Sequence, residues 1–458
     1  MLICLDSPTA AAGDTLKGLK DMSSVRNLMR PMITAPNLGA DMTAEKGNNG
    51  KEGQPVENKD WSLLHSAAEG GDVSIIEIIL SDGIEVNSKD SFGATPLMIA
   101  AAKCKKEAVD FLLSKGADPS LTTNTGRNSL HAAAQGGDVS IVETMLLHDI
   151  PLDSTDNDGI TSLMIAAALN NIETVKILFS NGADPLLKSN EGRTALFFTA
   201  LGGHTDVIKL ILSYGLEINS RDDKGLTTLM VAAACANLQA VSCLLENGAD
   251  PQLRSNDGLS PLHFASKADD AAIIKTLLSA GADVNVQSAS ITLMTPLMVA
   301  IREKKMEAIK CLLKNRADPL VESGLLRFSS LFFALYGDPE STVLCIIKAM
   351  LSSGLDVNAQ SSSGCTALMC AAFLNKREVF DFLLSNEGDL SVKDNDGRTV
   401  LHYASEGGDI TIIEKCLSYG LDIESKDNDG NTALDLAACS GSRDAFRFLK
   451  ERRSLKNS

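Results

Sequence analysis

The chain has 458 residues and a formal net charge of −17. This length exceeds what one compact core usually spans, so several domains or an array of repeats is expected. Only 4% of the residues are aromatic, which indicates a core of small aliphatic side chains. The acidic balance argues against a nucleic-acid partner, because a negative surface repels phosphate backbones.

Residues 1–57 are predicted to be a flexible N-terminal tail that lacks the features of a signal peptide. Within it, residues 37–58 are rich in Gly, Asn, Lys and Glu, which is typical of a linker. Apolar residues recur at every third position after a potential helix cap at Asp14: Leu16, Leu19, Met22, Val25 and Leu28. Two interpretations stay open, a disordered tail and a short amphipathic helix that docks on a partner or on the first repeat.

From residue 58 onward the sequence repeats itself. A marker leucine recurs twelve times: Leu64, Leu97, Leu130, Leu163, Leu196, Leu229, Leu262, Leu297, Leu331, Leu368, Leu401 and Leu434. The spacing is 33 residues, except for steps of 35, 34 and 37 between Leu262 and Leu368. We therefore predict twelve repeats over residues 58–453, followed by a C-terminal tail at 454–458.

Each repeat carries the signals of a tight turn followed by two helices. Ser, Thr or Asn stands two residues before every marker leucine, where its side chain can cap a first helix. Apolar residues at helical spacing, such as Val109, Leu112 and Leu113, predict a second helix. A glycine such as Gly116 usually follows it and can end it in the left-handed region.

The tetrad Asp-Asn-Asp-Gly opens three repeats, at 156–159, 394–397 and 427–430. If these were calcium loops of the EF-hand type, the closing glutamate would fall at Ile165, Tyr403 and Leu436, and none of these can bind the ion. Asp and Asn open tight turns by bonding their own backbone, and glycine closes them. The tetrad is therefore predicted to be a turn.

Turn, helix and helix within 33 residues, with the motifs Thr95-Pro96-Leu97-Met98 and Gly116-Ala117-Asp118, resemble the ankyrin repeat. The resemblance implies an all-α fold, an ankyrin-repeat solenoid of helix–turn–helix units with projecting β-turn fingers. A second period of 66 residues lies on top of the first, because odd repeats mostly place His after the marker and even repeats mostly place Met. Duplication of a two-repeat unit explains this alternation, and a functional role for it stays open.

No catalytic or metal-binding constellation is evident in the sequence. Four of the six histidines share one repeat position but lie at least two repeats, or roughly 20 Å, apart, so they cannot share a zinc ion. The resemblance implies that they make structural hydrogen bonds between repeats. The ten cysteines form no CxxC pair and are expected to be reduced core residues. We expect no enzymatic activity and no cofactor.

The resemblance implies a non-enzymatic scaffold or adaptor that binds protein partners in the concave groove of the array. The alternative is a substrate-targeting or regulatory subunit of a multi-chain enzyme. Residues 59–442 carry a net charge of −20, which favours a partner with a basic segment, although solubility alone could explain it. A cytoplasmic monomer is expected, with the nucleus as an alternative. No membrane insertion is expected, since the uncharged run 226–245 is interpreted as buried helices.

The resemblance places partner contacts at the residue after the turn glycine and at the end of the first helix. Apolar side chains at these positions are predicted to be exposed and to bind protein: Ile160, Leu169, Leu201, Leu226, Leu259, Met294, Phe328, Tyr336 and Phe373. Arginine follows the glycine in repeats three, five and eleven: Arg127, Arg193 and Arg398. The alternative is that these side chains pack on neighbouring fingers.

The array is predicted to be weakest across repeats eight and nine. Arg316 replaces the glycine that ends the second helix of repeat eight, and a left-handed residue there would be strained. Repeat nine lacks the polar turn tip, and its second helix gains four residues around 343–350.

Overall fold

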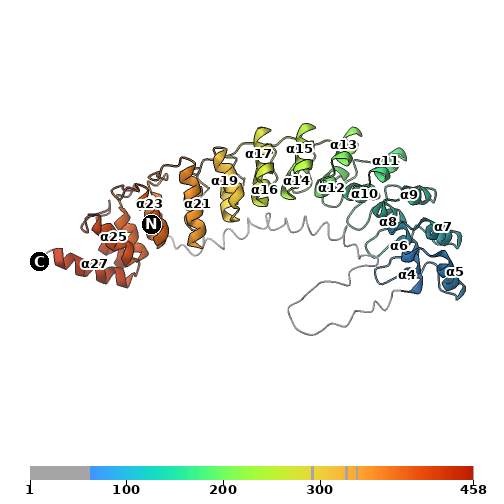
Figure 1. Cartoon of the computed structure of the whole chain (residues 1–458), viewed down its shortest axis with the longest axis horizontal. Helices are drawn as coiled ribbons and strands as arrows, with labels where there is room; N and C mark the ends of the chain where they lie inside the picture. The colour runs from blue at the N-terminus through green and yellow to red at the C-terminus, as the bar shows by residue number, and fades with distance from the viewer. Residues whose placement is uncertain (1–61, 290–292, 325–328, 337–338, 457–458) are drawn as a thin grey trace. The chain divides into compact units, whose positions relative to one another are not determined.

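The computed structural model describes residues 62–289, 293–324, 329–336 and 339–456, which hold 24 α-helices (Figure 1). These helices form twelve pairs, one for each marker leucine, so the predicted all-α fold is confirmed. The chain divides into two compact units, Met1–Asn256 and Asp257–Ser458, and the division falls between repeats six and seven.

The first helix of each pair begins directly after its predicted cap. In odd-numbered repeats these helices are α4 (Leu63–Gly70), α8 (Ser129–Gly136), α12 (Ala195–Gly202), α16 (Pro261–Ala268), α20 (Ser330–Leu335) and α24 (Val400–Gly407). In even-numbered repeats they are α6 (Pro96–Ala102), α10 (Ser162–Ala168), α14 (Thr228–Ala234), α18 (Pro296–Arg302), α22 (Ala367–Phe373) and α26 (Ala433–Cys439). Odd helices have 8 residues, apart from α20 with 6, and even helices have 7.

First helices of odd repeats end differently from those of even repeats. The 66-residue period in the sequence therefore corresponds to a difference in structure. Most odd helices end in a glycine followed by a left-handed residue, as at Gly136 and Gly137, where φ is 83°. A Cβ on Gly136 would lie 2.6 Å from the carbonyl oxygen of Ala101, so no larger residue fits there. In the even repeats two to ten the left-handed turn is taken by a non-glycine residue, such as Asn170 with φ of 63°, and in repeat twelve by Gly441.

The second helices run beside one another within each unit. They are α5 (Val73–Ser81), α7 (Lys106–Ser114), α9 (Val139–Leu146), α11 (Ile172–Ser180), α13 (Thr205–Ser213), α15 (Leu238–Glu246), α17 (Ala271–Ser279), α19 (Met306–Lys314), α21 (Glu340–Ser352), α23 (Arg377–Ser385), α25 (Ile410–Ser418) and α27 (Arg443–Lys456). Helix α21 has 13 residues where its neighbours α19 and α23 have 9, so the predicted gain of four is confirmed. Helix α27 continues to Lys456, while the domain boundaries at 57 and 453 stay predictions.

Small and aliphatic side chains form the core, as the scarcity of aromatic residues indicated. Within the described part of the chain, no helix is both long and apolar enough to cross a bilayer. The uncharged run 226–245 is divided between α14 and α15 by a turn at Ala236, where φ is 58°.

Candidate functional site

The acidic tetrads are turns, as predicted. In repeat four, Oδ1 of Asp156 accepts hydrogen bonds from the backbone amides of Asp158 and Ile160, at 2.9 Å each. Gly159 closes the turn with a φ of 74°. The same double acceptor recurs at Asp222, Asp394 and Asp427. Oδ1 of each of these carboxylates is therefore committed to the backbone of its own finger.

Asparagine links six of the fingers to the finger before, a feature that the sequence analysis missed. The amide of Asn157 donates to the carbonyl oxygen of Thr125 at 2.8 Å, and its side-chain nitrogen donates to that of Asn124 at 3.0 Å. Equivalent pairs of bonds are made by Asn124, Asn190, Asn256, Asn395 and Asn428. The sequence pattern that could have predicted this link is an asparagine at one repeat position. The role of this asparagine is structural.

The residue after the turn glycine is mostly buried, so its predicted exposure is wrong in three cases. Ile160, Leu259 and Met294 have 6%, 6% and 7% of their surface exposed, and Leu226 is half-buried. Met294 belongs to one core cluster with Val299 of its own repeat, and Phe333 of the next repeat packs against that cluster. The position is therefore filled by contacts between successive repeats.

The arginines at this position also face the next finger. Arg127 Nε lies 3.0 Å from Oδ2 of Asp156, and Arg193 Nε lies 3.4 Å from Oδ2 of Asp222. Arg193 is only 2% exposed and stacks over the ring of Phe197, with 4.9 Å from guanidinium to ring centre. Whether cationic or apolar, the side chain after the glycine packs on the neighbouring finger, which was the alternative interpretation.

The predicted residues at the first-helix ends are more accessible. Leu169, Leu201 and Phe373 are half-buried, and Tyr336 is 37% exposed. Phe328 lies outside the described residues. Of the nine predicted side chains, Tyr336 and Phe373 occupy the same helix-end position in adjacent repeats nine and ten.

Around these two residues lies a group that we call the aromatic cluster: Tyr336, Cys365, Cys370, Phe373 and Tyr403. The rings of Phe373 and Tyr403 meet edge to face with centres 6.5 Å apart. The Tyr403 hydroxyl lies 2.6 Å from Oδ2 of Asp394 and 2.9 Å from Sγ of Cys365. Because Asp394 accepts from its own finger through Oδ1, the cluster is anchored to the finger of repeat eleven.

In repeats nine to eleven, the side chain at one further position is more exposed than in earlier repeats. This position lies two residues after the marker leucine. The residues there are buried in repeats two to eight, as at Ile165, Val231 and Val299. In the next three repeats the equivalent residues, Phe333, Cys370 and Tyr403, are only half-buried. The finger-and-first-helix face of these repeats therefore offers more aromatic surface than the rest of its unit.

The cluster is not suited to nucleophilic chemistry. Burial raises the pKa of Tyr336 to about 12, and burial also raises the pKa values of Tyr403 and Cys370. A reactive cysteine needs a lowered pKa, because the thiolate is the nucleophile. These phenols and this thiol stay protonated at neutral pH, which suits them to contact rather than catalysis.

The repeated histidines make the structural bonds that the resemblance implied. Nε2 of His131 lies 3.0 Å from the carbonyl oxygen of Ile160, in the finger of the next repeat. His65, His263 and His402 make the same contact at 3.1, 2.9 and 3.3 Å. Burial lowers the pKa of His131, so the ring is neutral and Nε2 carries the donated hydrogen.

Within the described ranges, no three His, Cys, Asp or Glu side chains converge to hold a metal ion. Nine cysteines in those ranges are free, among them the buried Cys243, Cys311 and Cys416. Burial raises the pKa of Cys416 to about 12, so it is an inert core thiol.

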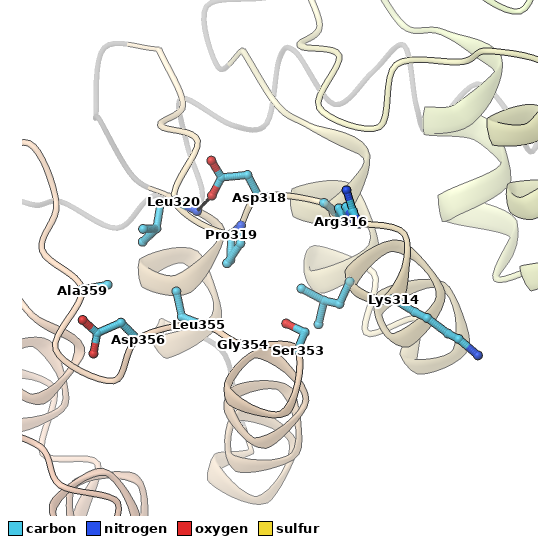
Figure 2. A pocket seen from close by; sticks show the side chains of 12 residues that line it. Lys314, Arg316, Asp318, Pro319, Leu320, Ser353, Gly354, Leu355, Asp356 and Ala359 are labelled. Carbon is cyan, nitrogen blue, oxygen red and sulfur yellow. Dashed lines mark hydrogen bonds between the residues drawn. The ribbon is translucent and has the colours of Figure 1, made fainter.

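A cavity of about 530 Å³ lies at the ends of α19 and α21, between repeats eight and nine (Figure 2). Leu320, Leu355 and Pro319 line it, and the Lys314 side chain extends away from the other labelled residues. The Asp318 carboxylate at its wall already accepts the amide of Leu320 at 2.8 Å. The cavity is therefore a packing gap beside the lengthened helix rather than a built ligand site.

Comparison with protein-family models agrees with this architecture. The family model for ankyrin repeats, which describes three copies, matches residues 39–123, 97–189, 183–255, 237–323, 297–394, 331–427 and 375–458. The solved human ASB11 ankyrin repeat domain is 24% identical, with a TM-score of 0.45 over 49% of this chain and 100% of that chain. No curated protein matches the chain.

Proposed function

The chain belongs to the ankyrin-repeat family, and we propose from this premise that it is a non-enzymatic scaffold or adaptor for protein partners. The observation that carries the proposal is the aromatic cluster of repeats nine to eleven. Tyr336 and Phe373 occupy the same helix-end position in adjacent repeats, Tyr336 directly after the six-residue α20 and Phe373 in α22, whose cap Thr366 accepts the amide of Met369. Aromatic anchors dominate the binding energy of many protein interfaces.

Charge around the cluster supports an oriented partner. The helix-end position occupied by Tyr336 and Phe373 carries Lys267 and Arg302 in repeats seven and eight, and Glu406 in repeat eleven. The finger residues Asp396 and Asp429 are exposed and add negative charge in repeats eleven and twelve, whereas Glu406 is paired with Arg398 at 3.7 Å. We therefore propose a partner segment with apolar or aromatic anchors for the cluster and basic residues toward repeats eleven and twelve.

The free cysteines support a reducing compartment, so we place the protein in the cytoplasm. Partner capture tests the proposed function. The full chain and its Tyr336→Ser/Phe373→Ser variant are used as baits in lysate of the native cell, and captured proteins are identified by mass spectrometry. We expect the double variant to lose a specific partner while its urea unfolding midpoint stays close to that of the unsubstituted chain.

A matched control replaces two half-buried leucines of the other unit, Leu169→Ser and Leu201→Ser, and should retain that partner. Full recovery of every partner by the Tyr336/Phe373 variant would exclude the cluster as the binding surface. Capture of a catalytic chain in fixed ratio would instead support the targeting-subunit alternative.

A further inference from the structure

The first repeat exposes apolar side chains at positions that are buried or half-buried in the later repeats of its unit. Leu63, Ile75 and Ile78 are 70%, 48% and 62% exposed. In the five later repeats of the same unit, residues equivalent to Leu63 are buried: Pro96, Ser129, Ser162, Ala195 and Thr228. Residues equivalent to Ile75 are buried as well: Ala108, Ile141, Thr174, Val207 and Ala240. The first repeat differs from these in having no described repeat before it.

The exposed face is unusual for the end of a repeat array. Terminal repeats normally carry a polar outer face, because no further repeat covers it. The outer face of α27 is mostly polar, since it exposes Arg447, Lys450 and Glu451, with Leu455 exposed in its last turn. An uncovered Leu63, Ile75 and Ile78 would cost hydrophobic free energy and favour aggregation, so a covering segment is expected.

We propose that residues 14–30 of the same chain form a helix that covers this face. The apolar stripe Leu16, Leu19, Met22, Val25 and Leu28 provides the complementary surface. Asp14 can cap the helix at its start, and Pro31 sets its end because a residue before proline disfavours the helical conformation. A short helix of this kind is marginal alone and gains stability by packing.

Charge and chain length favour this occupant. Residues 14–30 hold four basic and two acidic side chains, whereas residues 62–91 hold six acidic and one basic. Exposed Asp72, Glu77 and Asp82 lie on or beside α5, the helix that carries Ile75 and Ile78. The intervening residues 31–62 can span about 100 Å when extended, so the helix can fold back onto the first repeat.

Amide hydrogen exchange on the full chain tests the proposal. The Leu19→Asp/Met22→Asp variant disrupts the stripe, and we expect exchange in α4 and α5 to accelerate by about 10-fold or more, with α8 and α9 unchanged. The matched control, Ser24→Asp/Asn27→Asp, adds the same charge on the opposite side of the helix and should leave exchange in α4 and α5 unaltered. Equal exchange in the stripe variant and the unsubstituted chain would overturn the proposal.

The reciprocal variant changes the face itself. Ile75→Asp/Ile78→Asp should make residues 14–30 the first site of proteolysis, with a several-fold higher cleavage rate than in the unsubstituted chain. Its control, Leu147→Asp/Leu186→Asp, alters leucines elsewhere in the same unit that are at least as exposed, and it should leave that rate unchanged. Sedimentation tests whether a second copy of the chain covers this face instead, and a monomer excludes that occupant. A dimer dissociated by Ile75→Asp/Ile78→Asp but not by Leu19→Asp/Met22→Asp would overturn the proposal.

Discussion

Nε2 of His263 lies 2.9 Å from the carbonyl oxygen of Met294, and the bond joins repeat seven to the finger of repeat eight. The corresponding bonds of His65, His131 and His402 also run from an odd repeat to the following even one. In even repeats the position is mostly methionine, whose thioether has no hydrogen to donate. This link therefore cannot form from an even repeat with methionine to the next odd one.

Two further contacts follow the same alternation. The pairs Arg127–Asp156, Arg193–Asp222 and Arg398–Asp427 all join an odd repeat to the next even repeat. A second set of bonds also joins an odd repeat to the next even repeat. In each of them a side-chain oxygen of the odd repeat accepts the backbone amide of an aspartate in the even repeat: Asn87–Asp118, Asp153–Asp184, Asn219–Asp250, Asn285–Asp318 and Asn358–Asp389. The alternation thus has a structural consequence, because these three kinds of polar contact occur only from an odd repeat to the next even one among the residues named here.

Replacing a linking histidine by the residue of the even repeats tests the pairing. His131→Met removes the bond from Nε2 to the carbonyl of Ile160, which still accepts the amide of Asp156, and the bond that Nδ1 accepts from the amide of Asn128. At about 0.5–1.5 kcal/mol for each bond, we expect a loss of about 1–3 kcal/mol in the free energy of unfolding. Urea denaturation measures it. The control Met164→Leu alters the same position of an even repeat and should cost less than about 1.5 kcal/mol. If both variants lost the same free energy of unfolding, the histidine bonds would contribute no more to stability than side-chain packing at this position.

The buried histidines also predict a pH dependence. Burial lowers the pKa values of His65, His131 and His402 below their ordinary value of 6.5. Above pH 6.5 these rings are neutral in both states. As the pH falls below 6.5, the unfolded chain binds protons that the folded chain does not, so the free energy of unfolding falls until the folded-state pKa is reached.

Urea unfolding should therefore give a free energy of unfolding that declines as the pH is lowered from about 7.5 to about 5.5. This range starts about one unit above the ordinary pKa of histidine. Each buried histidine contributes a slope of up to about 1.4 kcal/mol per pH unit. His131→Met should have a shallower slope than the unsubstituted chain. Parallel slopes for the two proteins would contradict this assignment.

The local chemistry of one repeat was largely predictable from the sequence, whereas exposure was not. Capping residues, turn aspartates and left-handed glycines depend on neighbours a few positions away, and Thr95, Asp156 and Gly116 behave as expected. The burial of Ile160 and Met294 depends on the following repeat, which a one-repeat pattern does not contain. Leu259→Asp would consequently report on stability and not on binding.

Association with the partner should slow as salt is added. The reason is the net charge of −20 on residues 59–442, which would attract a basic segment toward the array. Such steering is screened over about 8 Å at physiological ionic strength. Stopped-flow association rates, measured with a partner recovered through the aromatic cluster, should fall between low and moderate salt. A rate that stays constant would exclude a basic segment as the attracted element.

Repeats eight and nine should be the weakest part of the second unit. Helix α20 has 6 residues, α21 has 13, and the cavity lined by Leu320 and Leu355 lies between the two repeats. Arg316 adopts the predicted left-handed conformation, with φ of 64°. Solenoid stability is a sum of repeat and nearest-neighbour contributions, so one poor interface allows the flanking repeats to unfold separately.

We therefore expect two transitions in urea, and first internal proteolysis within residues 314–330. Arg316→Gly should relieve the left-handed strain, raise the free energy of unfolding by about 1 kcal/mol, and slow that cleavage. Glu387→Gly is the matched control, because Glu387 has a φ of 68° at the equivalent position of repeat ten. It should stabilise the chain similarly without slowing cleavage at 314–330. A single transition by every probe, with first cleavage in repeats two to six, would show that repeats eight and nine pack as well as the others.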